Sequence, residues 1–276
     1  SQFYRESGDP ALRQLEIDFA DAVARQSRSK IYGRWCVFGN QLFGDTIAHE
    51  FVMSMLAPRS VKPAFEHLQE LQADVIVTTH WGSSYYVEKN KPYLIMYCPD
   101  LYSNGMFNMD CNNFLISTKE GLAQVRRQRM YAGGHTGLVN YPIREEAFAL
   151  EGKRSEIRAQ LGIPEDRFVV VLSDGGYGMA KLEKTVRALV RSNAKMTIMA
   201  VCGKNEAGAA RLRALQCPEN IDLRVFGFTD KMLEYLCMAD LYVGKAGANS
   251  IAEPTFFGLP VILTKCITPI EVGTKK

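Results

Sequence analysis

The residues best suited to chemistry in this chain form a run of small and polar side chains that ends at Glu253. The run reads Gly244-Lys-Ala-Gly247-Ala-Asn-Ser250-Ile-Ala-Glu253. Small residues that lead into a helix leave the backbone N–H groups of its first turn free to bind a diphosphate, and Ser250 adds a hydroxyl. Glu253 lies on a similar helix face, where its carboxylate can accept hydrogen bonds from two ribose hydroxyls. The alternatives are polarity at a helix start, from Asn249 to Glu253, or a capping box of Ser250 and Glu253.

Two further loops carry residues that could bind the same kind of ligand. In the loop Ser173-Asp-Gly175-Gly176-Tyr-Gly178, glycines let backbone N–H groups approach an anion, although a tight turn needs glycine in any case. In the loop Phe226-Gly-Phe228-Thr-Asp230, an aromatic ring beside a flexible turn could cover a flat base. The alternative for this second loop is a packed phenylalanine followed by a helix N-cap at Thr229 or Asp230.

The four histidines have different settings, and one of them could act as a base. His80 follows an apolar run, so it is the best general-base candidate, with a polar strand cap as the alternative. We expect His49 and His67 on helix surfaces and His135 in a flexible glycine-rich turn. The His, Cys and Asp residues show no metal-ligand spacing, so no metal site is predicted.

Strands and helices that alternate along the second half of the chain must position the three loops. Such alternation is typical of βαβ units with a parallel sheet, in which ligands bind at the carboxyl ends of the strands. The predicted strands of this half are 167–173, 196–202, 221–226, 241–243 and 261–263, and the predicted helices are 182–190, 205–216, 229–238 and 249–257. In the first half we expect strands at 73–79, 93–97 and 113–117, helices at 10–26 and 119–129, and a linker at 144–153.

Composition excludes several classes of protein and leaves most globular ones open. A net charge of +3 over 276 residues is too small to favour nucleic acid binding. Seven cysteines without a CxxC pair are typical of buried, reduced thiols in a cytoplasmic protein. No signal peptide or membrane-spanning stretch is recognisable, so we expect a soluble protein, with peripheral contact to the inner membrane face left open.

Four ordered motifs resemble those of one enzyme family. The stretch 239–263 is similar to the donor-binding signature of GT-B glycosyltransferases, and the motifs at 226–232, 173–179 and 140–144 extend the resemblance, with weaker similarity at 73–80 and 97–100. Within that family the chain looks most like the monogalactosyldiacylglycerol synthase and processive diacylglycerol glucosyltransferase group, relatives of the enzyme that makes lipid II. The resemblance implies two Rossmann-like domains that face each other across a cleft. Residues 1–145 would form the acceptor-side domain and residues 146–276 the donor-binding domain.

The resemblance also implies a role for each matching residue. Glu253 would bind the ribose of a UDP-sugar, Phe228 would border the uracil, and Glu271 would lie near the sugar. The remaining donor-binding residues would surround the diphosphate: Gly175, Gly176, Lys245, Gly247, Ala248, Asn249 and Ser250. Asp100 joins His80 as a catalytic candidate. The implied reaction is an inverting transfer of a hexosyl group to a lipid acceptor such as diacylglycerol, without metal or cofactor.

Several departures from the family pattern keep other functions open. A Gly-Gly-Gly-His turn after the first strand and a C-terminal helix are absent from this sequence, and Ile270 stands where relatives often carry Gln. We therefore expect a fragment of a longer protein, or a chain with unusual ends. The alternatives are a non-catalytic relative that binds a nucleotide-sugar or a partner subunit, and, ranked lower, a UDP-sugar 2-epimerase.

Overall fold

The structure, a computed structural model, describes residues 73–79, 93–103, 107, 111–127, 135–173, 175 and 182–265, of which Asn249 and Lys265 are described in their backbone only. The chain divides into two compact units, Ser1–Asn140 (unit 1) and Tyr141–Lys276 (unit 2). The predicted helix at 10–26, the residues His49, His67 and His80, and the end of the chain with Glu271 lie outside the described residues.

In the described residues of unit 1, four strands form a parallel sheet in which they follow one another in sequence order. The strands are β1 (Val75–Thr78), β2 (Tyr93–Cys98), β3 (Asn113–Ile116) and β4 (His135–Leu138). Alternate residues of β2, namely Leu94, Met96 and Cys98, are buried against Phe114 and Ile116 of β3, as expected when one sheet face is covered. The three strands predicted in this half are confirmed. His135 begins β4, so its predicted place in a flexible turn is wrong.

Helix α7 (Lys119–Val125) follows β3 and confirms the helix predicted there, although it ends earlier. Its N-cap is Thr118, whose Oγ1 accepts a hydrogen bond from Gly121 N at 3.0 Å. Only glycine fits at position 121, because a Cβ there would lie 2.6 Å from the carbonyl oxygen of Leu101. The start of α7 is therefore fixed against the loop that leaves β2.

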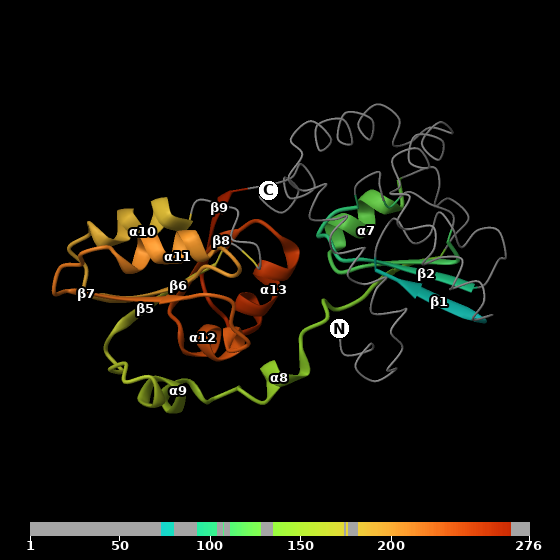
Figure 1. Cartoon of the computed structure of the whole chain (residues 1–276). Helices are drawn as coiled ribbons and strands as arrows, with labels where there is room; N and C mark the ends of the chain where they lie inside the picture. The colour runs from blue at the N-terminus through green and yellow to red at the C-terminus, as the bar shows by residue number, and fades with distance from the viewer. Residues whose placement is uncertain are drawn as a thin grey trace, which may run out of the picture. The chain divides into compact units, whose positions relative to one another are not determined.

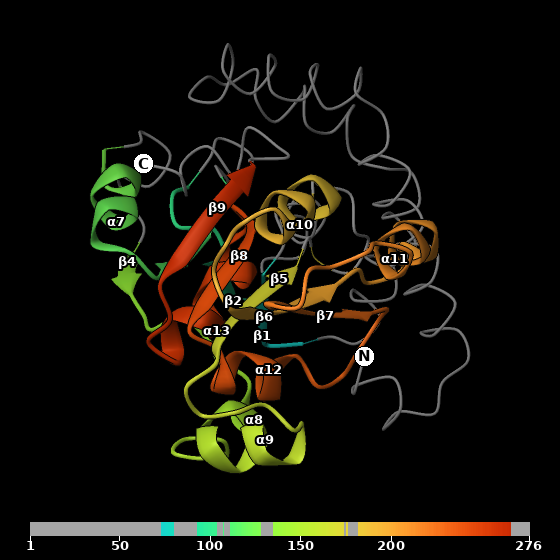
Figure 2. The same ribbon diagram turned by 90° about the vertical axis from the view of Figure 1, so that its left-hand side faces the viewer.

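In the described residues of unit 2, five strands form a parallel sheet with the order β7-β6-β5-β8-β9. The strands are β5 (Phe168–Ser173), β6 (Met196–Val201), β7 (Ile221–Phe226), β8 (Leu241–Lys245) and β9 (Val261–Lys265), which confirms all five predicted strands. Figure 2 shows the twist of this sheet. The chain passes from β5 outward to β7 and then returns to β8 on the other side of β5. The strand order therefore reverses between β5 and β8, which is where open sheets of this kind bind ligands.

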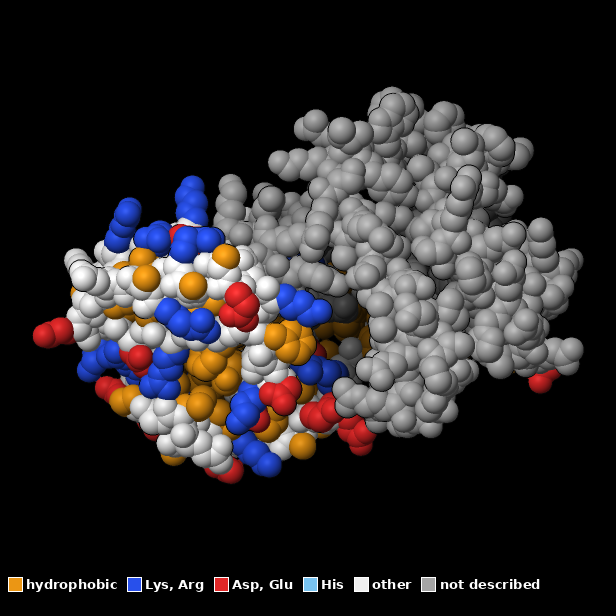
Figure 3. Space-filling model, viewed as in Figure 1, with side chains coloured by type: hydrophobic (Ala, Val, Ile, Leu, Met, Phe, Trp, Pro, Cys, Tyr) orange, Lys and Arg blue, Asp and Glu red, His pale blue; other side chains and the backbone are white. Residues whose placement is uncertain are grey.

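Helices cover both faces of the unit 2 sheet, so its central strands are apolar on both sides (Figure 1). Val170 and Leu172 of β5 pack with α10 (Leu182–Val190) and α11 (Glu206–Arg213), while Val169 and Val171 pack with α9 (Arg154–Gln160) and α12 (Met232–Met238). Helix α13 (Ala248–Phe256) contacts α12, β8 and β9. Figure 3 shows that lysine and arginine side chains gather over α10 and α11.

The predicted linker at residues 144–153 is instead part of the packed structure of unit 2. Residues Glu145–Phe148 form the short helix α8, Ala147 is fully buried, and the Phe148 ring contacts Phe256 edge to face at 4.8 Å. Leu150 packs against the core, and its carbonyl accepts a hydrogen bond from Cys237 Sγ at 3.1 Å. The sequence was misleading here because charged residues surround the few apolar side chains that make these contacts.

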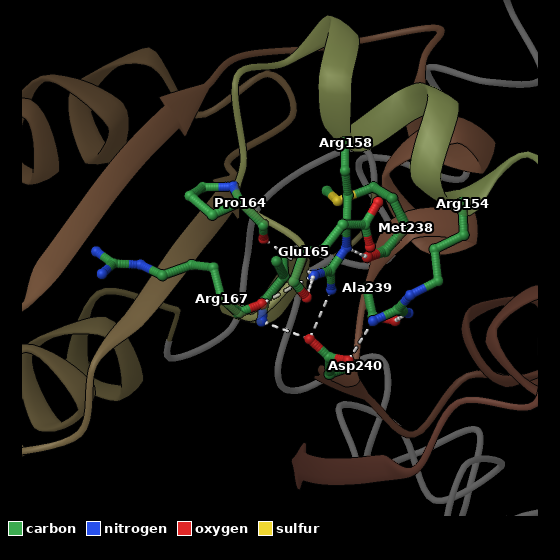
Figure 4. A network of polar contacts seen from close by, with 9 residues as sticks. Arg154, Arg158, Pro164, Glu165, Arg167, Met238, Ala239 and Asp240 are labelled. Carbon is green, nitrogen blue, oxygen red and sulfur yellow. Dashed lines mark hydrogen bonds and ion pairs between the residues drawn. The ribbon is translucent and has the colours of Figure 1, made fainter.

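A buried arginine ties α9 to the start of β8 (Figure 4). Arg158 is fully buried, and its guanidinium donates to Asp240 Oδ2 at 2.8 Å and to the carbonyl oxygens of Met238, Glu165 and Arg167. Asp240 also accepts from Val169 N at 2.7 Å and from Arg154. This network lies at the amino end of β5, so it holds the sheet in place from the edge opposite the predicted loops.

Candidate functional site

The three predicted loops all leave the carboxyl edge of the unit 2 sheet. The first follows β5, the second follows β7 and the third follows β8, and Ser173 pairs with Gly244 in the register of β5 and β8. The sequence alone predicts that each of these loops follows the end of a strand. The sheet order adds that the first and third are neighbours at the point where the strand order reverses.

A hollow of about 190 Å³ lies among these loops, and the described residues that line it all belong to unit 2. Its lining includes Ser173 and Gly175 from the first loop, Phe228 from the second, and Ser250, Glu253 and Pro254 from α13. Four of the predicted donor-binding residues, Gly175, Phe228, Ser250 and Glu253, are thus gathered in one place. They come from segments nearly 80 residues apart in the chain, and only the fold brings them together.

The start of α13 provides the amides that were predicted to bind an anion. Gly247 is the N-cap, in an extended conformation, and it has no side chain with which to cap the first turn. Ser250 N donates to Gly247 O at 2.9 Å, so the amides of Ala248 and Asn249 precede the first hydrogen bond of the helix. The positive end of a nine-residue helix dipole therefore lies beside the β8 loop.

Of the two structural alternatives for this stretch, the capping box is wrong. A capping box would require Ser250 as the N-cap, but Ser250 is the third residue inside α13. Asn249 is the second residue inside the helix, so the alternative of polarity at a helix start stays open. The Glu253 carboxylate bonds to an arginine side chain and remains part of the hollow's lining.

Gly175 and Lys245 approach each other closely next to the hollow. Gly175 has φ of 76°, a conformation that favours glycine, and a Cβ at this position would lie 3.3 Å from Lys245 Cε. The aliphatic stem of Lys245 therefore lies beside Gly175. This packing brings a cationic side chain to the loop that was predicted to approach the diphosphate.

Phe228 is the most exposed large apolar side chain in the described part of the chain, at 71% of its surface. The alternative that it packs in the core is therefore wrong. The alternative N-caps are wrong as well, because α12 is capped at Lys231, while Thr229 Oγ1 accepts from Lys231 N at 3.1 Å in a local turn. An exposed ring beside a hollow is available to cover a planar ligand.

Arg144 is the site residue whose contact the sequence did not reveal. Its Nε donates to Glu253 Oε1 at 2.6 Å and its Nη2 donates to Oε2 at 3.1 Å. The hydrogen bonds to Glu253 raise the pKa of Arg144, with a smaller opposing effect of burial and further support from the charges of Glu253 and Glu146. Arg144 belongs to the motif at 140–144 that carries the family resemblance, but nothing in the sequence identifies its partner 109 residues away.

The remaining predicted residues divide between unit 1 and parts of the chain that are not described. Asp100 is half-buried just beyond the carboxyl end of β2. His80, Gly176 and Glu271 lie outside the described residues, as does the side chain of Asn249. Across the described ranges, no group of three or more His, Cys, Asp and Glu side chains is placed to hold a metal ion.

Residues 169–266 match the glycosyltransferase family 28 C-terminal domain. The match runs from β5 to the end of β9, so it includes all three loops of the candidate site. The match lies wholly within unit 2.

Comparison with curated proteins confirms the resemblance to monogalactosyldiacylglycerol synthases. A probable chloroplastic monogalactosyldiacylglycerol synthase of Glycine max is 34% identical over 139 residues, which cover 48% of this chain and 26% of that protein. Probable monogalactosyldiacylglycerol synthase 3 of Oryza sativa subsp. japonica is 25% identical over 242 residues, which cover 82% of this chain and 47% of that protein. The chain thus spans less than half the length of these two relatives.

Comparison with solved structures confirms the predicted α/β fold of the GT-B type. The chain matches MurG from Acinetobacter baumannii with a TM-score of 0.55 over 80% of this chain and 60% of that one, at 15% sequence identity. At this identity the likeness concerns the fold alone. In the described part of the chain, no helix has the length and apolar character needed to cross a membrane.

Proposed function

We propose that this chain transfers a hexosyl group from a UDP-sugar to a lipid acceptor such as diacylglycerol. The single observation that carries the proposal is the hollow of unit 2, where Gly175, Phe228, Ser250 and Glu253 meet at the carboxyl edge of the sheet. Together these residue types suit the base, the ribose and the diphosphate of a nucleoside diphosphate. The family 28 domain and the similarity to monogalactosyldiacylglycerol synthases support the sugar donor and the lipid acceptor.

In this proposal the donor nucleotide lies across the three loops of unit 2. The exposed Phe228 ring covers the uracil, and the Glu253 carboxylate accepts hydrogen bonds from the ribose hydroxyls. The diphosphate binds the first-turn amides of α13, the Ser250 hydroxyl and the backbone of Gly175 and Gly176. Glu271 contacts the sugar, as the family pattern implies.

The transfer is a displacement at the anomeric carbon. The acceptor hydroxyl oxygen forms a bond to this carbon while the bond to the diphosphate oxygen breaks, so the configuration inverts and UDP leaves with the electron pair. Negative charge then grows on the diphosphate. In this scheme the amides of α13 and the ammonium group of Lys245 stabilise this charge, without a metal ion or cofactor.

The acceptor and the proton-accepting base belong to unit 1 in this proposal. His80 and Asp100 follow consecutive strand segments of the parallel sheet, and either can take the proton of the acceptor hydroxyl. A lipid acceptor requires the protein to contact a membrane surface from the cytoplasmic side. A chain that binds the donor without catalysing transfer is the second candidate, since Ile270 stands where relatives often carry Gln.

The test is a transfer assay with diacylglycerol vesicles and radiolabelled UDP-galactose or UDP-glucose, with EDTA present. We expect label in the organic extract, and we expect Glu253→Ala to lower the rate at least tenfold because charge-assisted hydrogen bonds contribute about 1.5–3 kcal/mol each. Glu219→Ala is the control, since Glu219 is an exposed acidic residue just before β7, at the other edge of the sheet. Donor binding without transfer would favour the binding protein. Conversion of the donor sugar into its 2-epimer would favour the epimerase. The absence of donor binding would contradict all three functions.

A further inference from the structure

The ion pair between Arg144 and Glu253 has a geometry that leaves the carboxylate usable. The guanidinium contacts both carboxylate oxygens, through Nε to Oε1 at 2.6 Å and through Nη2 to Oε2 at 3.1 Å. Each carboxylate oxygen has two lone pairs, and this fork occupies one on each oxygen. One acceptor position on each oxygen therefore remains, which matches the two neighbouring hydroxyls of a ribose.

The two residues differ in their access to the hollow. Glu253 is among the residues that line it, whereas Arg144 is absent from the described lining, and the Arg144 side chain is 48% exposed against 21% for Glu253. Arg144 thus reaches Glu253 from outside the hollow. From this position the Arg144 guanidinium acts on a ligand in the hollow through the Glu253 carboxylate.

The position of Arg144 is itself fixed by the packing of α8 on α13. Arg144 and Phe148 are four residues apart at the two ends of α8, and Glu253 and Phe256 are three residues apart on α13, so each pair lies on one helix face. Arg144 contacts Glu253, and the Phe148 ring contacts the Phe256 ring edge to face at 4.8 Å. Two contacts between the same pair of faces set the angle from which the guanidinium approaches the carboxylate.

We propose that Arg144 is a positioning residue that holds the Glu253 carboxylate oriented for the 2′- and 3′-hydroxyls of the donor ribose. The inference rests on the proposed function, because it takes a nucleotide ribose as the ligand of Glu253. A glutamate side chain has several rotamers, and fixing one of them before the ligand arrives strengthens binding without any new contact. Arg144 therefore contributes to affinity through the ribose and leaves the diphosphate and the base to other residues.

The competing interpretations make different predictions. An exposed arginine–carboxylate pair often contributes little, and then loss of Arg144 changes nothing in binding. If the guanidinium turned into the hollow and held the diphosphate, its loss would weaken UDP relative to uridine. If Arg144 positions Glu253, its loss weakens ligands with two ribose hydroxyls relative to ligands with one.

The experiment measures dissociation constants of UDP, 2′-deoxy-UDP and uridine for the full chain and for Arg144→Gln and Arg144→Lys. We expect Arg144→Gln to lower the affinity for UDP about tenfold and the affinity for 2′-deoxy-UDP much less. The preference for UDP over 2′-deoxy-UDP therefore falls. The ratio between UDP and uridine stays the same, because the diphosphate contacts are untouched. Arg144→Lys restores part of the preference, since lysine provides the charge without the two-pronged geometry.

Two further variants make the result decisive. Arg187→Gln removes a surface arginine that contacts Glu183 through Nε at 3.2 Å and Nη2 at 2.9 Å, away from the hollow, and we expect no change in any ratio. Glu253→Ala separates this inference from the proposed function. If Glu253→Ala abolishes the preference for UDP over 2′-deoxy-UDP while Arg144→Gln keeps it, only the role of Arg144 is contradicted.

If Glu253→Ala also keeps that preference, the ribose role of Glu253 is wrong and the proposed donor site fails with it. The positioning role would be overturned if both Arg144 variants lost equal affinity for UDP and for 2′-deoxy-UDP. It would also be overturned if only the preference for UDP over uridine changed. Thermal melting of each variant checks that the fold is intact, and Arg144→Lys serves where Arg144→Gln does not fold.

Discussion

Arg158 and Asp240 form a buried ion pair across 82 residues of sequence, with Arg158 Nη2 and Asp240 Oδ2 2.8 Å apart. The Arg158 side chain has no exposed surface, and backbone carbonyls accept hydrogen bonds from its Nε and Nη1 groups. The pair connects α9 to the ends of β5 and β8 where these strands begin. The amino edge of the sheet thus has a polar anchor, while the carboxyl edge holds the hollow.

Replacement of Arg158 by methionine tests this anchor. We expect the free energy of unfolding to fall by about 3–5 kcal/mol, because the change leaves a partly buried carboxylate and several carbonyl groups without their donor. Urea denaturation followed by circular dichroism measures the loss. Arg187→Met is the control, since the exposed Arg187–Glu183 pair should contribute less than about 1 kcal/mol. An equally small loss for Arg158→Met would show that the buried network does not stabilise unit 2.

Stability should also depend on pH through Asp240. Burial alone would raise the pKa of this carboxyl, but hydrogen bonds from Val169 N, Arg154 and Arg158 outweigh burial and lower it below the ordinary value of 3.8. A lowered folded-state pKa means that the stabilisation is complete above the unfolded pKa and is lost as the pH falls through the folded pKa. We therefore expect the difference in unfolding free energy between wild type and Asp240→Asn to be constant near neutral pH and to shrink below about pH 4. A difference that stays constant down to pH 2 would contradict the assignment.

Gly175 offers a test of the glycine loop with a closely matched control. Gly175 and Gly152 have φ of 76° and 75°, but a Cβ at Gly175 would meet Lys245 Cε at 3.3 Å, whereas a Cβ at Gly152 would meet no described atom within 4 Å. We expect either change to alanine to cost about 1–2 kcal/mol of stability through backbone strain. Only Gly175→Ala should also weaken UDP binding in a titration, because only Gly175 lines the hollow. Equal UDP affinities in the two variants would remove this loop from the donor site.

Phe228 should matter for binding and not for stability. Its ring is 71% exposed, so Phe228→Ala is expected to change the unfolding free energy by less than about 0.5 kcal/mol. If the ring covers the uracil, its loss should weaken UDP by about 1–3 kcal/mol, the usual range for stacking of a base on an aromatic side chain. Phe168→Ala is the control, because Phe168 is 46% exposed but begins β5 at the other edge of the sheet. An unchanged UDP affinity for Phe228→Ala would contradict a stacking role.

The sequence predicted the elements of unit 2 well because the apolar runs of its strands are short, regular and separated by glycine-rich turns. Val169 to Leu172 is a continuous apolar run, which fits a strand with helices on both faces. Residues 145–148 were harder, since a four-residue helix with one fully buried alanine has no clear periodicity. His135 was misjudged because the glycines before it obscured a short edge strand.

The sequence predicts the loops of the candidate site but does not predict which arginine pairs with which carboxylate. Gly247, Ser250 and Glu253 stand close together in sequence, so their helix and its free amides could be inferred locally. The partners of Glu253 and Asp240 are arginines 109 and 82 residues away, and several other arginines in the chain would have satisfied the same chemistry. Only the packing of α8 and α9 on the sheet decides which arginine meets which carboxylate.

The central claim is that UDP binds the hollow of unit 2 and that Glu253 holds it there. Isothermal titration of the full chain with UDP, and with ADP as the base control, tests this claim most directly. We predict saturable binding of UDP that is stronger than that of ADP, and at least a tenfold loss of UDP affinity in Glu253→Ala with no change in Glu219→Ala. Absence of UDP binding by the wild-type chain, or an unchanged affinity in Glu253→Ala, would contradict the account.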